Sequence, residues 1–444
     1  MKRALILTVG TGARSDVFIV KPLIKTVRDS RPDFTVFVVS GESHKNAQAI
    51  AVALGLEDEG ATAILKENSA DGGGATESAS PTPAQAATCR IVSLENPEDF
   101  DSVFRAVNRI FRELLRCGYT PDDIQLDFTS GTKAMTAGAA LSAVYNQCAS
   151  LKYITGERRN GLVMDDTERF LSIEPKRILR LYDMKVAVNL IHHLRFDAAL
   201  EILKEIKEQI LDSEEAQELA AMRRLAEAYL AWELFSHGAA RKDFAKLPPA
   251  TSHCAAYLPT PAIIKHLEHL TEKDGDSSGA RLCDLFNNGR RRAQEGKYDD
   301  AVARLYRAVE LCAQNRLGSQ YGIQTGDVDL GKVPVGPYRE SLSQCYDAGD
   351  GKTRIGLFRA YELLDVLGDP LGVAFRERKT MAGRIKKRNN SILAHGTDPV
   401  SDSLCGNLLK DAAALFEAVR PGFMEYADRI QFPWLKKGDV CGIF

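Results

Sequence analysis

The chain has 444 residues, enough for about two to four domains, and its 44% hydrophobic and 27% charged residues are ordinary for a soluble protein. Its formal net charge of −2 excludes a molecule-wide field for polyanions, so any nucleic-acid site must come from local clustering of Lys and Arg. Nine cysteines without a C-x-x-C pair argue against a zinc ribbon or a disulfide framework, and for a reducing, cytoplasmic compartment.

The first third of the chain alternates apolar runs with helical patterns. It begins with MKRALILTVGTG, which predicts a first strand rather than a signal peptide, and no apolar run in the chain approaches the roughly 20 residues of a membrane span. Strands are predicted at 3–9, 34–41, 89–94, 124–129 and 151–155, with a last β-hairpin at 161–173. Helices are predicted at 17–28, 42–54, 98–117 and 132–147. This alternation indicates a mostly parallel sheet covered by helices, with ligands at the C-terminal strand ends.

Two loops at predicted strand ends carry groups that suit an anion. The first, TVGTGARSD (8–16), has a G-x-G but lacks the third glycine of a dinucleotide fingerprint. The second, DFTSGTK (127–133), leads into a helix of small residues, whose first backbone amides, with Thr132 and Lys133, would favour a phosphate. Separately, each loop is explained by tight-turn chemistry. Together on one sheet edge, they favour a nucleotide-like ligand.

This pair of loops resembles that of the CARF domains of CRISPR-associated accessory proteins, in which TVGTG is paired with a later D-x-T-[SG]-G-T-K-x-M helix start. The resemblance spans roughly residues 1–175. It implies a Rossmann-like fold and a homodimer that binds cyclic oligoadenylate across its two-fold axis. It also implies a pocket lined by Thr11, Gly12, Arg14, Ser15, Gly131, Thr132 and Lys133. The alternative to a pocket that only binds its ligand is one that also cleaves it slowly, with Thr11 or Lys133 involved.

From Lys176 onward helical periodicity replaces the strand signals. Amphipathic patterns predict helices at about 186–206, 214–236, 300–315, 353–367, 371–388 and 403–428. We interpret 176–280 as a helical connector and 281–444 as a helical domain with a Gly-rich interruption at 318–337. The alternative is one continuous helical domain that includes the connector.

The stretch KKRNNSILAHG (386–396) contains the side chains that are candidates for catalysis. If it is helical, Arg384, Arg388, Ser391 and His395 form one polar stripe, and Gly396 and Pro399 stop the helix. A guanidinium suits phosphate, and the end of a helix favours imidazolium. A phosphate clamp beside a proton carrier suits RNA cleavage through its own 2′-hydroxyl. The alternative is an exposed basic helix, rich in Lys and Arg over 376–388, whose lone histidine caps the last carbonyls.

The same stretch resembles the R-x(4–6)-H signature of HEPN ribonucleases, with six residues between Arg388 and His395. The resemblance implies that His395 is catalytic, that Arg388 binds or polarises the scissile phosphate, and that Asn389 and Ser391 are supporting polar groups. In the helix at 300–315, Arg304, Arg307 and Glu310 are candidates to approach this site, with Glu310 orienting Arg388. The alternative is ion pairing between Arg307 and Glu310.

These observations predict an α/β plus all-α protein, with a Rossmann-like CARF domain at 1–175, a helical connector at 176–280 and a helical HEPN domain at 281–444. By the two resemblances it is a cytoplasmic homodimer without a membrane partner, and an endoribonuclease of CRISPR antiviral defence that cuts single-stranded RNA. Cyclic oligoadenylate would be its allosteric activator, and catalysis would use no metal or other cofactor and leave 2′,3′-cyclic phosphates. Two alternatives stay open: a non-catalytic messenger sensor or adaptor with a degenerate HEPN domain, and a metal-dependent nuclease. For the latter we find no carboxylate–carboxylate–lysine constellation.

Overall fold

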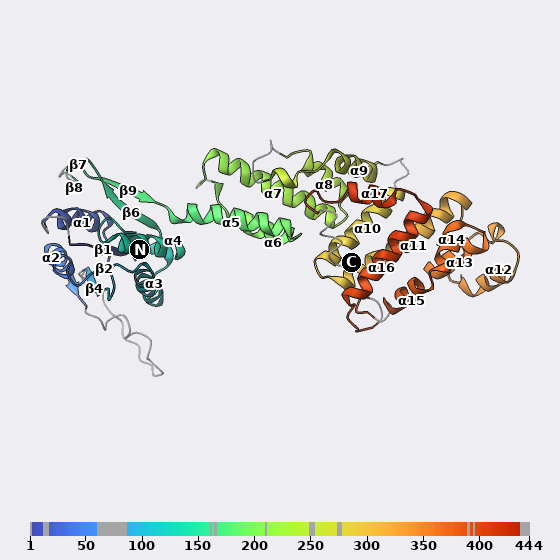
Figure 1. The fold of residues 1–444 in the computed structure, drawn as a ribbon, viewed down its shortest axis with the longest axis horizontal. Coiled ribbons are helices and arrows are strands. Elements are labelled where there is room, and N and C mark those ends of the chain that lie inside the picture. Colours follow the sequence, from blue (N-terminus) through green and yellow to red (C-terminus); the bar gives the residue numbers. More distant parts are fainter. Residues whose placement is uncertain are drawn as a thin grey trace. The chain divides into compact units, whose positions relative to one another are not determined.

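A computed structural model gives the fold of the chain in two compact units, Met1–Asp183 and Met184–Phe444, which we describe one at a time (Figure 1). The structure describes residues 2–11, 17–59, 87–159, 162–163, 167–208, 211–247, 254–272, 278–388, 391–393 and 396–435. The α/β sheet expected in the first unit and the helices expected in the second are both present, which confirms the predicted fold class.

The first unit is built on a seven-stranded sheet with the order β3-β4-β2-β1-β5-β6-β9. Its strands are β1 (Ala4–Val9), β2 (Phe34–Val39), β3 (Glu57–Asp58), β4 (Thr88–Ser93), β5 (Ile124–Asp127), β6 (Ser150–Thr155) and β9 (Arg169–Ile173). All neighbours are parallel except β6 and β9. The hairpin predicted at 161–173 is therefore wrong, because β9 returns along β6, and a separate short hairpin joins β7 (Arg158–Arg159) and β8 (Leu162–Val163).

Helices cover both faces of this sheet, which explains why its central strands are continuous apolar runs. On β1, Ala4 and Ile6 pack into a core with α3 (Phe100–Arg116) and α4 (Lys133–Tyr145). The alternate residues, among them Leu5 and Leu7, pack into a second core with α1 (Val17–Ser30) and α2 (His44–Leu54). Successive side chains of a strand point to opposite faces of the sheet. A sequence that alternated apolar and polar residues would therefore have placed polar side chains in one of the two cores.

The second unit is helical, apart from a two-stranded hairpin of β10 (Tyr346–Asp347) and β11 (Lys352–Thr353) that the sequence did not predict. The helix α5 (Pro175–His192) crosses the boundary between the units. The helices that follow are α6 (Phe196–Glu205), α7 (Ser213–Glu233), α8 (His237–Phe244), α9 (Pro261–Thr271), α10 (Ser278–Gln294), α11 (Tyr298–Tyr321), α12 (Pro337–Ser341), α13 (Leu357–Val366), α14 (Pro370–Glu377), α15 (Lys379–Arg388), α16 (Asp402–Val419) and α17 (Phe423–Arg429).

Two helices predicted as continuous are broken. The pattern at 186–206 divides between α5 and α6 at Leu194, whose φ of 61° lies in the left-handed region. The pattern at 371–388 divides at Arg378 between α14 and α15. Each pair keeps its apolar residues on a face that packs inward, so hydrophobic periodicity alone does not reveal the break.

Buried charges join α7 and α8 to α10 inside the second unit. The Glu233 carboxylate, 2% exposed, accepts hydrogen bonds from Arg291 and Arg292. Asp284 accepts from Trp232 Nε1 at 2.6 Å and is 2.7 Å from His237 Nε2. Burial opposes the charge on Asp284, but hydrogen bonds from His237 and His266 and the charge of Arg291 outweigh it and lower its pKa. Asp284 is therefore ionised in the folded protein, and its charge is part of the buried cluster.

We expect Asp284→Asn to lower the free energy of unfolding of the second unit by about 3 kcal/mol, because the change leaves buried donors without their charged acceptor. Denaturant titration followed by tryptophan fluorescence measures this, since both tryptophans of the chain, Trp232 and Trp434, lie in that unit. Asp350→Asn is the control, since Asp350 pairs with Arg354 on the surface. Equal midpoints for the two variants would contradict a structural role for the Asp284 charge.

Candidate functional site

Two loops of the first unit meet at the point where the strand order of the sheet reverses. The chain passes from β1 to β2 on one side and returns to β5 on the other side of β1. In open α/β sheets, such a switch point at the carboxyl ends of the strands is where ligands bind. The loops that the sequence singled out, after Val9 and after Asp127, both begin there.

The backbones of these loops touch. Gly10 N donates a hydrogen bond to Ser130 Oγ at 2.9 Å, and Thr8 Oγ1 donates to the Ser130 carbonyl. A Cβ added to Gly10 would lie 2.8 Å from Gly131 N, closer than any side chain tolerates. Gly131 itself has a φ of 123°, which favours glycine. Gly10 is therefore required by the close approach of the loops, and Gly131 by its backbone conformation.

The described members of the predicted ligand set divide by exposure. Thr11, Gly131 and Lys133 are exposed, as a ligand would need. Thr132 is half-buried, and its hydroxyl accepts from Met135 N at 3.1 Å as the N-cap of α4 and donates to the Pro97 carbonyl at 2.6 Å. Its side chain thus fixes the start of α4, where free backbone amides favour an anion. The predicted residues Gly12, Arg14 and Ser15 lie outside the described residues.

One side chain that the sequence analysis missed holds the first loop. Asn46, buried on α2, donates from Nδ2 to the Gly10 carbonyl at 2.9 Å and reaches the Thr11 carbonyl at 3.5 Å. The available signal was a polar residue on the inward face of an amphipathic helix, which needs a buried partner. On the other loop, the carboxylate of Asp127 accepts from Thr129 N at 2.8 Å, and burial raises its pKa.

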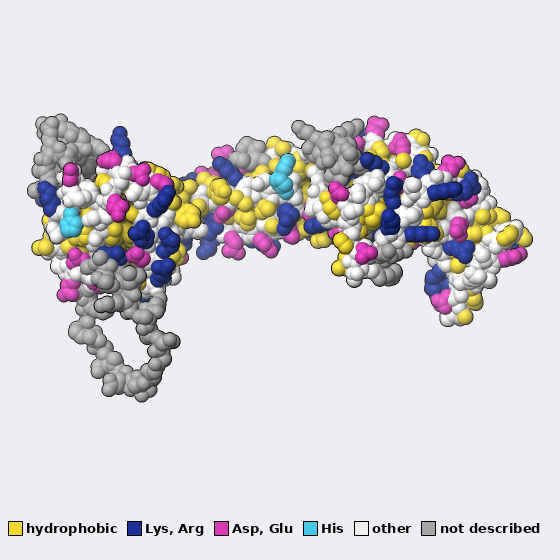
Figure 2. Space-filling model, turned by 60° about the horizontal axis from the view of Figure 1, so that its bottom comes forward, with side chains coloured by type: hydrophobic (Ala, Val, Ile, Leu, Met, Phe, Trp, Pro, Cys, Tyr) yellow, Lys and Arg dark blue, Asp and Glu magenta, His cyan; other side chains and the backbone are white. Residues whose placement is uncertain are grey.

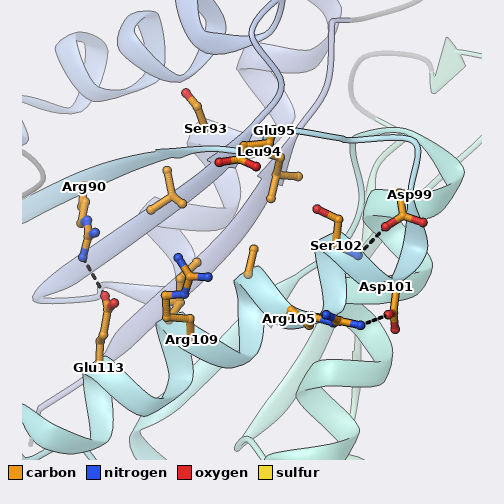
Figure 3. A pocket seen from close by; sticks show the side chains of 13 residues that line it. Arg90, Ser93, Leu94, Glu95, Asp99, Asp101, Ser102, Arg105, Arg109 and Glu113 are labelled. Atoms are coloured by element: carbon orange, nitrogen blue, oxygen red, sulfur yellow. Dashed lines mark hydrogen bonds and ion pairs between the residues drawn. The ribbon is translucent and has the colours of Figure 1, made fainter.

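A separate cleft of about 390 Å³ lies along β4 and α3, and none of the predicted ligand residues lines it (Figure 3). Its charges largely cancel: Arg90 pairs with Glu113 at 2.8 Å, and Arg105 pairs with Asp101. Figure 3 shows Arg109 between these two pairs, and no carboxylate of the described chain pairs with it. The cleft is thus mixed in charge rather than basic.

In the second unit, α15 ends at Arg388, where the helix predicted at 371–388 also ends, so the helix considered for 386–396 does not form. Ser391 N donates to the Arg388 carbonyl at 2.9 Å, and Ser391 forms an isolated bridge with Asp398. Asn and Ser side chains compete with the backbone for hydrogen bonds, so the sequence Asn-Asn-Ser favours a turn here. The predicted residues Asn389 and His395 lie outside the described residues. The single helical stripe from Arg384 is therefore not formed.

Arg388 is held by two neighbours. Its guanidinium carbon lies 4.7 Å from the ring centroid of Tyr306 on α11, and its Nη2 donates to the Leu393 carbonyl at 3.3 Å. Arg388 Nε and Ser391 Oγ are buried, and neither has a hydrogen-bond partner within the described part of the chain. Tyr306 was missed: the sequence analysis expected the helix at 300–315 to approach Arg388, but it named the charged residues of that helix and not this aromatic one.

The other expected neighbours are engaged elsewhere. Glu310 pairs with Arg307 at 2.9 Å, as the alternative reading had it, and Arg304 pairs with Asp300 at 2.6 Å. In the basic run 376–388, carboxylates neutralise two arginines: Arg376 pairs with Asp365, and Arg384 with Asp411. Of the run's seven cations, those without a carboxylate partner in the described ranges include Lys379, Lys387 and Arg388. Figure 2 shows basic and acidic side chains intermixed on the face that it presents.

Three further properties concern the described residues only. No group of three or more His, Cys, Asp or Glu among them is placed to hold a metal ion. None of their helices is long and apolar enough to cross a membrane. The eight cysteines among them are free thiols, and six are buried.

Comparison with known proteins relates both helical segments to one family. The family model of the Csm6 6H domain matches residues 179–274, and that of the Csm6 HEPN domain matches 272–417, which includes positions 388 and 395. The CRISPR system endoribonuclease Csm6 of Thermus thermophilus is 25% identical over 348 residues, which are 72% of this chain and 73% of that protein. The structure of Enterococcus italicus Csm6 bound to cyclic hexa-2′-fluoro-hexa-dAMP matches 100% of this chain and 97% of that chain, with a TM-score of 0.55 and 13% identity. At this identity the structural match speaks for the fold alone.

We expect Gly10→Ala to push the two loops of the first unit apart at a cost of about 1–3 kcal/mol, because the new methyl group has no space beside Gly131 N. Hydrogen–deuterium exchange of peptides that contain Ser130 and Gly131 should accelerate. Gly41→Ala is the matched control, since its Cβ would meet nothing within 4 Å at the end of β2. Equal exchange in both variants would show that the loops do not depend on this approach.

Proposed function

Because the chain belongs to the Csm6 family, we propose that it is an endoribonuclease of CRISPR antiviral defence that cyclic oligoadenylate activates. The observation that carries the proposal is the match of the HEPN family over 272–417, which contains an Arg388 whose charge no described carboxylate cancels. The Thermus relative is named an endoribonuclease, and the Enterococcus structure holds a cyclic hexa-adenylate analogue. We assign the messenger-sensing CARF domain to 1–175, the connector to 176–280 and the ribonuclease domain to 281–444.

The reaction we propose is an internal transesterification of single-stranded RNA. The 2′-oxygen attacks the adjacent phosphorus, the bond from phosphorus to the 5′-oxygen breaks, and the ends left are a 2′,3′-cyclic phosphate and a 5′-hydroxyl. His395 takes the proton of the 2′-hydroxyl or supplies one to the leaving oxygen. Arg388 stabilises the charge that develops on the non-bridging oxygens, with Asn389 and Ser391 as supporting polar groups. These groups supply the proton transfer and charge stabilisation, so we propose that cleavage needs no metal.

The messenger site we propose is the switch point of the sheet, with Thr11, Gly12, Arg14, Ser15, Gly131, Thr132 and Lys133 as its lining. Two features support it. The close approach of Gly10 to Gly131 brings the two loops together, and α4 begins at this edge with a lysine as its first residue. Free amides at a helix start and a lysine both favour phosphate. A symmetric ring can engage the same loops of two subunits, which suits a two-fold dimer.

The surface we propose for dimerisation of the first unit is the apolar outer face of α3 and α4. Leu141 and Tyr145 on α4 are 48% and 69% exposed, and Phe100 on α3 is 41% exposed. Phe104 joins them, with its ring centroid 5.9 Å from that of Tyr145. Exposed apolar side chains that gather in this way mark interaction surfaces. Since α4 starts at the proposed messenger site, a second copy on this face would also meet that site's helix.

We expect His395→Ala to slow RNA cleavage by at least about 100-fold, because a positioned proton carrier contributes that much. Arg388→Ala should slow cleavage by a similar factor, because the charge that develops on the phosphate oxygens is then less well stabilised. Cleavage of a fluorogenic RNA with cyclic oligoadenylate and EDTA present measures both, and His269→Ala, an exposed histidine of α9, is the control. Unchanged cleavage in His395→Ala would reject its role and favour the sensor or adaptor alternative, whereas loss of activity in EDTA would favour a metal-dependent nuclease.

We expect Tyr145→Glu to weaken dimerisation at least about tenfold, because an unpaired carboxylate buried between subunits is costly. Sedimentation velocity over a range of protein concentrations measures the change. Val52→Glu is the control, because Val52 is 81% exposed on α2, which covers the opposite face of the sheet. Dimers of equal stability in both variants would place the interface elsewhere.

A further inference from the structure

An aromatic ring that the proposed mechanism does not use lies against its phosphate-binding group. Tyr306 projects from α11, and its ring centroid is 4.7 Å from the Arg388 guanidinium carbon. At this distance the negative face of the ring attracts the cation. A hydrogen bond from Nη2 to the Leu393 carbonyl holds one edge of the same guanidinium. The side chain of Arg388 is thus restrained on one face and along one edge.

The ring is held rigidly. It extends from a 24-residue helix whose neighbouring residues Leu305 and Val309 are fully buried, and it packs, half-buried, on the core of the second unit. Arg388, in contrast, is the last residue of α15, where its long side chain would otherwise rotate freely. An arginine side chain loses conformational entropy when it is fixed in place. A rigid support that already fixes Arg388 therefore reduces the entropy that is lost when the substrate binds.

The kind of support matters as much as its position. Four residues earlier on α15, Arg384 is fixed by the Asp411 carboxylate, which cancels its charge. Arg388 has no described carboxylate partner, and its plane is fixed by a ring instead. An aromatic face orients a guanidinium while leaving its positive charge and its outer N–H groups for a phosphate.

We propose that Tyr306 is a positioning residue for RNA cleavage, whose ring holds the Arg388 guanidinium in the plane that the scissile phosphate meets. This inference rests on the proposed function and assigns the role to the ring rather than to the hydroxyl. Burial and the charge of Glu310 raise the pKa of Tyr306, although Arg388 opposes them, so the hydroxyl stays protonated and is not a base.

Tyr306→Phe and Tyr306→Leu separate the ring from the hydroxyl. In single-turnover cleavage with saturating protein and cyclic oligoadenylate, we expect Tyr306→Leu to slow the reaction about tenfold, which corresponds to the loss of one cation–π contact. Tyr306→Phe should stay within about twofold of the unmodified protein, because phenylalanine also offers a ring face. Affinity for RNA, measured with a substrate whose 2′-hydroxyl is replaced by hydrogen, should change less than the rate, since the phosphate's extra charge develops only during reaction.

Phe358→Leu is the matched control. Phe358 is also half-buried on the core of the second unit, and its ring lies 5.5 Å from Nζ of Lys386, another cation of α15. The Phe358→Leu substitution removes an aromatic ring that lies against α15 but does not contact Arg388, so the rate of cleavage should be unchanged. Equal losses in Phe358→Leu and Tyr306→Leu would make the effect one of general packing and overturn the proposal.

Two further outcomes would also overturn it: full activity in Tyr306→Leu, or equal losses in Tyr306→Phe and Tyr306→Leu. Failure of the proposed function has a different signature. In that case the unmodified protein does not cleave RNA, or Arg388→Ala cleaves at the full rate. If the unmodified protein cleaves and Arg388→Ala does not, the Tyr306 variants test the positioning role alone.

Discussion

The buried carboxylate of Glu233 is the constraint that shapes the helical part of the protein. It accepts hydrogen bonds from Arg291 and Arg292, so the last residue of α7 and the last turn of α10 share one desolvated cluster of charges. Separating them would leave those charges buried and unpaired, at a cost of several kcal/mol. Residues 184–444 form one compact unit, and α5 is the covalent link from it to the sheet. We therefore expect the 6H and HEPN segments to respond to a messenger together.

The two proposed sites solve a common problem, which is to present positive charge to phosphate without cancelling it. At the switch point, the close contact of Gly10 with Gly131 brings the two loops together beside the start of α4, whose first residue is the exposed Lys133 and whose helix end favours anions. In the helical unit, the ring of Tyr306 and the Leu393 carbonyl orient Arg388. Nearby arginines that serve the fold, such as Arg376 and Arg384, are instead paired with carboxylates.

Much of the first unit follows from its sequence, because strands buried on both faces must be continuous apolar runs, as RALILTV and FTVFVV are. The meeting of the two loops followed from the rule for strand ends. Periodicity failed where helices are interrupted: it missed the breaks at Leu194 and at Arg378. The contact of Tyr306 with Arg388 spans a long sequence separation, so only packing reveals it, whereas Asn46 left a signal as a polar residue on the inward face of α2.

The central claim is that a messenger at the sheet edge controls cleavage by the helical domain. It is tested most directly by the initial rate of RNA cleavage at increasing concentrations of cyclic tri-, tetra- and hexa-adenylate, in the unmodified protein and in Lys133→Ala. We predict that one ring size activates the unmodified protein, and that Lys133→Ala needs at least about tenfold more of it for half-maximal activity while its maximal rate is unchanged, since one charge-assisted phosphate contact is lost. A cleavage rate that does not depend on any of the three rings would contradict the account.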